Sequence, residues 1–224
     1  DHRDLHSFPT RRSSDLSLIW DAGGTLFDTY PAVARSFQRV LQSWGHSVSQ
    51  ERILQLCRRS TDHCMTVLSQ DLGLEKARLH EDFKACYAAV SSEAQEPFPG
   101  VVDLCAWVCD HGGQNFVITH RGRDSLLDLL RAHGMSDYFT DWITADDEYP
   151  RKPDPATFEV LIQRHHLDRQ ATLAIGDREI DMIAAQAAGL RTCFFGDDPL
   201  SVPVDFAITD FAQLQEILSR VWDA

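Results

Sequence analysis

From residue 17 onward, short apolar runs alternate with amphipathic helical stretches, and this alternation constrains the fold more than any other feature of the sequence. We expect strands near residues 17–20, 116–118, 142–144, 172–175, 192–195 and 205–208. We expect helices at residues 101–111, 124–133, 155–166, 179–188 and 210–222. Strands that alternate with helices are typical of a parallel sheet covered on both faces. The sequence therefore predicts an α/β fold with a Rossmann-like, doubly wound parallel sheet.

One stretch interrupts this alternation. Residues 31–96 show only helical periodicity, and Gly45 and Gly73 are candidate helix ends within it. A segment rich in proline and glycine, which begins at Pro97, then breaks the helical pattern. We predict an inserted all-helical domain at residues 31–96, and a core built from residues 17–30 and 97–224.

Residues 1–16 differ from the rest of the chain. They carry charged residues and a proline without any periodicity, and they lack the apolar centre of a signal peptide. Back-translated, they resemble a widely used sequencing-adapter oligonucleotide that has been read in frame. We interpret them as a non-native, disordered leader, and we expect the native N-terminus to be missing.

Charge and composition exclude several classes of partner. The net charge of −13 repels nucleic acid and anionic lipid surfaces, and no apolar run is long enough to span a membrane. The six cysteines contain no CxxC pair and fit small buried side chains in a reducing compartment. We expect a cytoplasmic protein, monomeric or homodimeric, that binds neither nucleic acid nor membranes.

Polar residues follow the first two predicted core strands, at the edge of a parallel sheet where ligands bind. Asp21 ends the first strand, and Gly23 and Gly24 allow a ligand to approach the backbone. Thr119 follows the next core strand, where a hydroxyl and nearby backbone N–H groups suit a phosphoryl oxygen. Taken alone, each also fits an ordinary turn or a strand end.

Two further motifs follow later strands. Lys152, one of three lysines in the chain, lies between two prolines, and its restricted backbone helps to aim the side chain. Asp177 ends a strand, and Asp181 lies one helical turn further on, so that both carboxylates can face one cation. Carboxylate oxygens suit Mg²⁺.

The four motifs, in this order at successive strand ends, resemble those of the haloacid dehalogenase superfamily, whose members are mostly Mg²⁺-dependent phosphatases. The resemblance covers about residues 17–224 and includes the helical insertion, which is called a cap in the phosphoglycolate-phosphatase-like branch. The segment from Pro97 to Val101 also looks like that branch.

The resemblance implies a role for each motif residue. Asp21 is the expected nucleophile and forms an aspartyl-phosphate. Thr119, with His120 and Arg121 beside it, is expected to bind the phosphoryl group. Lys152 is expected to stabilise the charge of that group and to screen Asp21. The expected catalytic set also includes His120, as a replacement for a residue that is absent here.

The same resemblance implies an Mg²⁺ site. Asp21, Asp177 and the carbonyl of Gly23 are expected to hold the ion, and Asp181 to support it directly or through a second contact. The implied partner is a small phosphorylated metabolite, either a phosphoric monoester or an acyl phosphate. A metal ion and Lys152 would supply the positive charge that phosphoryl transfer needs on an acidic protein.

One departure from the family pattern affects the mechanism. Phosphatases of this family carry a second Asp two residues after the nucleophile, and here that position is Gly23. The missing Asp protonates the leaving alkoxide and later activates water, which is general acid–base catalysis worth about 10²–10⁴-fold. His120, or a cap histidine such as His46 or His63, can take its place, or the leaving group needs no acid.

Two alternative functions stay open. Phosphonoacetaldehyde hydrolases of the same superfamily also lack this Asp and cleave a C–P bond with a cap lysine, for which Lys76 and Lys84 are the candidates here. Alternatively, the protein is a weak or inactive phosphatase that binds a phosphorylated ligand. We favour an Mg²⁺-dependent hydrolase that works through an aspartyl-phosphate, with altered or missing acid–base chemistry at Gly23.

Overall fold

The structure, a computed structural model, describes residues 16–222. Residues 1–15 of the predicted leader lie outside this range. For Leu16 the prediction of a disordered leader is wrong, because its side chain is buried in the core and its carbonyl accepts a hydrogen bond from the Gln114 N–H. An apolar residue directly before a buried strand packs with that strand.

The chain divides into two compact units. One unit contains the described residues up to Phe27 and from Pro97 onward, and we call it the sheet unit. The other, Asp28–Glu96, is the helical unit. Among the described residues, no helix is both long enough and apolar enough to cross a membrane.

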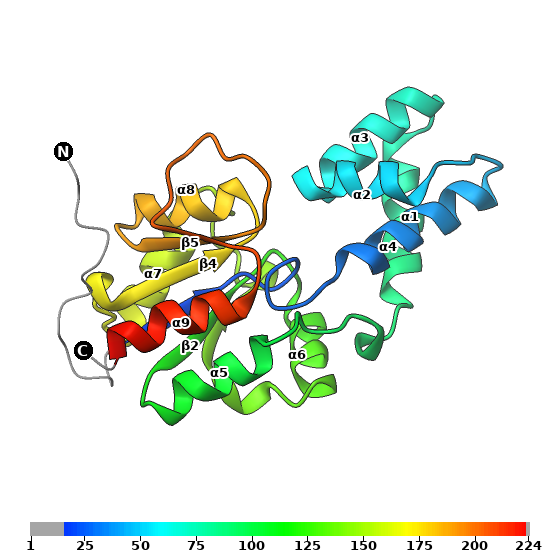
Figure 1. The fold of residues 1–224 in the computed structure, drawn as a ribbon. Helices are drawn as coiled ribbons and strands as arrows, with labels where there is room; N and C mark the ends of the chain where they lie inside the picture. The colour runs from blue at the N-terminus through cyan, green and yellow to red at the C-terminus, as the bar shows by residue number, and fades with distance from the viewer. Residues whose placement is uncertain (1–15, 223–224) are drawn as a thin grey trace. The chain divides into compact units, whose positions relative to one another are not determined.

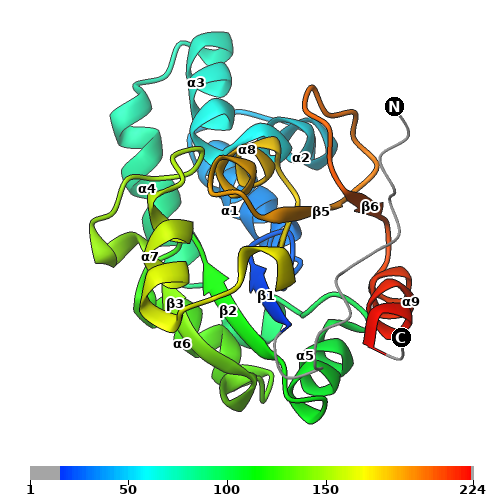
Figure 2. The same ribbon diagram turned by 90° about the vertical axis from the view of Figure 1, so that its left-hand side faces the viewer.

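The sheet unit contains a six-stranded parallel sheet with the order β3-β2-β1-β4-β5-β6 (Figures 1 and 2). Its strands are β1 (Ser17–Trp20), β2 (Gln114–Ile118), β3 (Phe139–Ile143), β4 (Thr172–Gly176), β5 (Arg191–Phe195) and β6 (Phe206–Ile208). Strand β1 lies in the middle, where Ser17 is opposite Gln114 on β2 and Thr172 on β4. The chain order therefore reverses direction across the sheet between β1 and β4.

Helices cover both faces of this sheet (Figure 1). Leu18 and Trp20 of β1 pack in one apolar cluster with α5 (Val101–Asp110), α6 (Arg123–Ala132) and α9 (Phe211–Trp222). Ile19 points to the other face and packs with α7 (Ala156–His165) and α8 (Glu179–Ala187). Burial on both faces explains why β1 is a continuous apolar run. The doubly wound fold predicted from the sequence is confirmed.

A buried hydrogen-bond network joins the middle of the sheet to its neighbours. The Trp20 Nε1–H donates to Oδ1 of Asn115 at 3.0 Å. The amide nitrogen of Asn115 in turn donates to the carbonyls of Cys105 at 3.1 Å and Tyr138 at 3.2 Å. Because its polar atoms are paired, Asn115 can be fully buried.

The helical unit consists of α1 (Tyr30–Ser43), α2 (Gln50–Arg59), α3 (Thr61–Leu72) and α4 (Lys76–Ala88), followed by a short 3₁₀ turn, η2 (Ser92–Ala94). Ser49 and Ser60 accept hydrogen bonds from backbone N–H groups at the starts of α2 and α3. Gly73 ends α3 in the left-handed conformation, as predicted, because its φ of +65° strains any residue with a Cβ atom. The insertion is all-helical, as expected for this fold class.

Candidate active site

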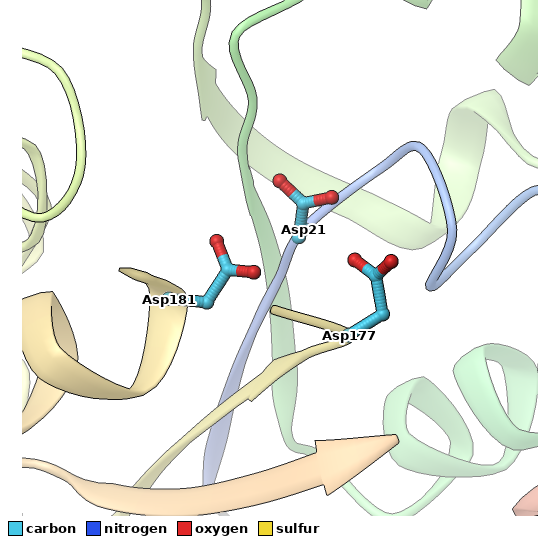
Figure 3. Close-up of side chains that lie close together, drawn as sticks. All are labelled: Asp21, Asp177 and Asp181. Carbon is cyan, nitrogen blue, oxygen red and sulfur yellow. The ribbon is translucent and has the colours of Figure 1, made fainter. Parts of the chain in front are cut away.

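Three carboxylates converge at the carboxyl end of the sheet, where the strand order reverses (Figure 3). Asp21 follows β1, Asp177 follows β4, and Asp181 lies in the first turn of α8. One oxygen from each lies within 4.8 Å of the others. The structure thus brings together three of the predicted site residues from two strand ends and one helix.

The turn after β1 fixes the backbone of Asp21. The Asp21 N–H donates to the carbonyl of Ile175 at 2.9 Å and so continues the pairing of β1 with β4. The chain then folds back on itself, because the Gly24 N–H donates to the Phe27 carbonyl at 2.8 Å. Gly24 has a φ of +93°, a conformation that favours glycine. Gly23, half-buried, lies in this turn and pairs with Phe27.

Lys152 lies in the loop between β3 and α7, and its side chain is 1% exposed. Its Nζ lies 2.6 Å from Oδ1 of Asp21 and 2.5 Å from Oδ1 of Asp181. It also donates to the carbonyl of Ile118, at the end of β2, at 3.1 Å. An ammonium group has three N–H donors. Lys152 therefore hydrogen-bonds Asp21 and the Ile118 carbonyl and forms an ion pair with Asp181, so that it joins the ends of β1 and β2 to α8.

The charges of this cluster shift the pKa values of its members. Burial lowers the pKa of Lys152, but the charges of Asp181 and Asp21 outweigh burial and raise that pKa above its usual value. Burial raises the pKa of Asp21, and the charge of Asp181 adds to this effect, although Lys152 opposes it. Burial also acts on Asp181, but Lys152 and Arg178 outweigh it, so that the pKa of Asp181 is lowered.

The donor set of the cluster fits a divalent cation. Asp177 is half-buried, and its Oδ1 accepts a hydrogen bond from the Thr25 hydroxyl at 3.4 Å. Asp21 and Asp181 are both buried. Three carboxylates this close repel one another unless a cation lies between them. Hard oxygen ligands of this kind suit Mg²⁺.

Gly176 makes room for Asp181. A Cβ atom at position 176 would lie 2.5 Å from Cβ of Asp181 and 2.8 Å from its Cγ and Oδ2. No side chain at 176 fits without moving Asp181, since real Cβ atoms do not approach other atoms so closely. Sequence reasoning assigned no role to Gly176. The one signal for it was a glycine directly before an aspartate at a strand end.

The segment after β2 is partly buried beside Lys152. The Thr119 N–H donates to the Ile143 carbonyl at 2.9 Å, and its hydroxyl accepts from the Arg121 N–H at 3.2 Å. Thr119 directly follows Ile118, the carbonyl partner of Lys152. The Arg121 guanidinium donates to the Ser125 hydroxyl at 2.7 Å.

His120 lies next to Thr119 and is only partly exposed. Burial lowers the pKa of its imidazole to about 4, and the nearby charges of Lys152, Arg178 and Arg151 act in the same direction. The ring is therefore neutral at pH 7, and it can accept a proton but has no acidic proton to donate. Its predicted catalytic role stays a prediction.

Arg178 is a second residue of this site that sequence reasoning missed. It follows Asp177 directly, its backbone N–H donates to Oδ2 of Asp181 at 3.1 Å, and its Nε lies 4.0 Å from the same oxygen. Its side chain is 19% exposed. Little in the sequence points to it, since an arginine at the start of a helix is usually a solvated surface residue.

Comparisons with known proteins identify the family of the chain. Residues 18–195 match the family described as haloacid dehalogenase-like hydrolase. A phosphoglycolate phosphatase of Vibrio parahaemolyticus is 26% identical over 92% of this chain and 97% of its own length, and one of Yersinia pestis is 30% identical over 77% of each chain. A hydrolase from Streptococcus pneumoniae superposes with a TM-score of 0.66 at 29% identity, over 92% of this chain and 99% of its own. Together with the site geometry, these matches confirm the resemblance noted in the sequence: the chain belongs to the haloacid dehalogenase-like hydrolase family.

Proposed function

We propose that this protein is an Mg²⁺-dependent phosphatase that acts on a small phosphorylated metabolite through an aspartyl-phosphate on Asp21. The observation that carries the proposal is the buried contact of Asp21 with Lys152 at 2.6 Å, beside Asp177 and Asp181. Burying Asp21, Lys152 and Asp181 together is costly, so a chemical role is the best reason for keeping them. The names of the relatives support a phosphomonoester substrate.

Asp21, Asp177, Asp181 and the Gly23 carbonyl are the proposed ligands of the metal ion. When bound, Mg²⁺ would supply positive charge to the phosphoryl oxygens and favour the ionised form of Asp21. A site with three carboxylates needs this added positive charge to bind an anionic phosphoryl group.

The other roles in phosphoryl transfer are assigned to side chains of the protein. A carboxylate oxygen of Asp21 attacks phosphorus, the bond between phosphorus and the leaving oxygen breaks, and its electron pair stays on that oxygen. Lys152 holds the carboxylate in place, and the Thr119 hydroxyl donates to a phosphoryl oxygen. Water then attacks phosphorus, the bond between phosphorus and the Asp21 oxygen breaks, and its electron pair stays on the regenerated Asp21 carboxylate. The protons of the water leave with the released inorganic phosphate.

Within the sheet unit, nothing in this set donates a proton to the leaving oxygen. Gly23 has no acidic group, Lys152 is held by three acceptors, and His120 has a pKa of about 4. We therefore propose that the preferred substrates have leaving groups that are stable as anions, such as acyl or aryl phosphates. An alkyl phosphate would need an acid from elsewhere in the chain.

The test is hydrolysis of matched substrates with and without Mg²⁺: an acyl phosphate, an aryl phosphate, 2-phosphoglycolate and a second alkyl phosphate. The expected result is metal-dependent turnover of the first two, little turnover of the alkyl esters, and none in Asp21→Asn. Rapid hydrolysis of 2-phosphoglycolate would show that a replacement acid exists, and His120→Gln would then be assayed. No turnover of any substrate, with Mg²⁺ and phosphate still bound, would favour a binding protein over an enzyme.

The local setting of the helical-unit lysines favours hydrolysis over C–P bond cleavage. Lys76 donates to the Thr66 hydroxyl at 2.8 Å and pairs with Asp62 at 2.7 Å on the surface of α3 and α4. Lys84 is also exposed on α4. A lysine that forms a Schiff base is typically desolvated in an apolar pocket or lies beside another cation, whereas Lys76 and Lys84 are both exposed.

A further inference from the structure

Arg178 places a second positive charge in the candidate site, and the start of α8 does not depend on that charge. The hydrogen bond that closes the first turn of α8 comes from the backbone N–H of residue 178 to Asp181. Any residue except proline at this position can make that bond. The guanidinium is therefore not needed to start the helix.

The Arg178 side chain nevertheless lies beside one carboxylate of the site. Its Nε lies 4.0 Å from Asp181 Oδ2, and its charge acts on Asp21, Lys152 and His120 as well as on Asp181. With Lys152 it forms an unfavourable pair of like charges. The neighbouring carboxylates offset this repulsion as long as no metal ion is bound to them.

The net charge of the site and the hydrogen-bond donors of its two cations also favour the binding of an anion. The three carboxylates exceed the charge of Lys152 and Arg178 by one, and a bound divalent cation would make the site net positive. Lys152 already hydrogen-bonds Asp21 and the Ile118 carbonyl and forms an ion pair with Asp181. A guanidinium offers five donors in a planar fork that matches phosphate.

We propose that Arg178 is a substrate-binding residue whose guanidinium binds the phosphoryl group, while Lys152 holds Asp21 and Asp181 in position. This inference rests on the proposed function. It assigns phosphate affinity to Arg178 and the alignment of the nucleophile to Lys152.

The experiment measures two affinities by titration calorimetry in Arg178→Gln, Arg178→Lys and the wild type. These are the affinity for inorganic phosphate with Mg²⁺ present, and the affinity for Mg²⁺ alone. We expect Arg178→Gln to weaken phosphate binding about tenfold or more, because a charge-assisted hydrogen bond is lost. Arg178→Lys should restore part of this loss. The Mg²⁺ affinity should stay equal or rise, since a positive charge beside Asp181 has gone.

A matched control is Arg131→Gln, which removes the same charge from an exposed arginine on α6. It should leave both affinities unchanged. Unchanged phosphate affinity in Arg178→Gln would overturn the proposal. So would a parallel loss of Mg²⁺ affinity and thermal stability, because that pattern indicates a structural role. If the wild type binds phosphate through Arg178 but hydrolyses no ester, the proposed enzymatic function fails and this inference stands.

Discussion

The sheet unit and the helical unit bury different kinds of side chain. Among the described residues, the buried carboxylates and amines all belong to the sheet unit: Asp21, Lys152 and Asp181. The buried polar residues of the helical unit are uncharged: Thr29, Ser36, Ser69 and Gln95. Buried charges destabilise a fold unless they are well paired, whereas apolar burial stabilises it. The difference indicates that the charged cluster exists for chemistry, while the interior of the helical unit serves packing.

The sharpest way to break this comparison is Asp21→Asn. We expect turnover to fall by about 10³-fold or more, because the nucleophile is lost. Stability should change little, since the amide oxygen can still accept a hydrogen bond from Lys152 and a buried negative charge is removed. Steady-state kinetics and thermal unfolding of the same preparation measure both effects. Asp124→Asn, at an exposed site on α6, is the control, and an active Asp21→Asn enzyme would refute the proposed mechanism.

Leu79→Ala in the helical unit should lower stability and leave the chemistry of the site unchanged. Leu79 is fully buried on α4, and its truncation should destabilise the protein by about 2–5 kcal/mol through lost burial and a new cavity. Affinity for Mg²⁺ should stay at the wild-type value while the protein remains folded. Chemical denaturation and metal titration test this pair of outcomes. If the folded variant no longer binds Mg²⁺, the interior of the helical unit affects the metal site as well as stability, which would contradict the comparison.

A glycine in each unit sharpens the comparison further. Gly176→Ala should cost about 1–3 kcal/mol by overpacking, because its Cβ meets Asp181, and it should also weaken Mg²⁺ binding. Gly73→Ala should cost about 1 kcal/mol, because its backbone is left-handed, but it meets no atom within 4 Å and should leave metal binding unchanged. Equal effects of the two variants on metal binding would contradict the role assigned to Gly176.

The smallest predicted effect concerns a charged group of the sheet unit outside the site. Burial raises the pKa of Asp141, but hydrogen bonds from His165, Arg164 and the Trp142 N–H outweigh burial, so that the pKa lies below its usual value. The stabilisation is therefore present above the unfolded pKa, near 4, and is lost as the pH falls through the lower folded value. Asp141→Asn should lower the melting temperature by a few degrees at pH 7. The difference from wild type should shrink below about pH 4, and an unchanged difference there would contradict this origin.

Much of the sheet unit follows from the apolar pattern of the sequence. Strands such as β4, predicted at residues 172–175 and found at Thr172–Gly176, are buried on both faces and read as continuous apolar runs. The start of β3 was harder to predict, because this edge strand carries Thr140 and Asp141 among its apolar residues. A half-exposed edge lacks the continuous apolar signal on which the prediction relied.

Site residues could be predicted where a carboxylate directly follows a predicted strand or lies one helical turn beyond it. Asp21 and Asp177 end apolar runs, and Asp181 follows at one helical turn, so that their convergence could be expected from the sheet alone. Gly176, Arg178 and Asn115 could not be predicted in the same way. Their importance comes from close approaches to Asp181 and Trp20, and such approaches emerge only when the whole fold is known.

The central place of β1 has a consequence for how the chain folds as it is synthesised. Strand β1 is made first, yet its neighbours β2 and β4 begin at Gln114 and Thr172. The Asp21–Lys152 contact spans 131 residues. Meanwhile the helical unit is continuous from Asp28 to Glu96 and can fold while β1 still lacks both partners. The pairing of β1 with β2 and β4 is slow because it joins distant parts of the chain, and it leaves the apolar strand β1 exposed on the nascent chain until then. The active site therefore forms only after β4 and α8 have been made, and its assembly reports that β1 has paired with both of its neighbours.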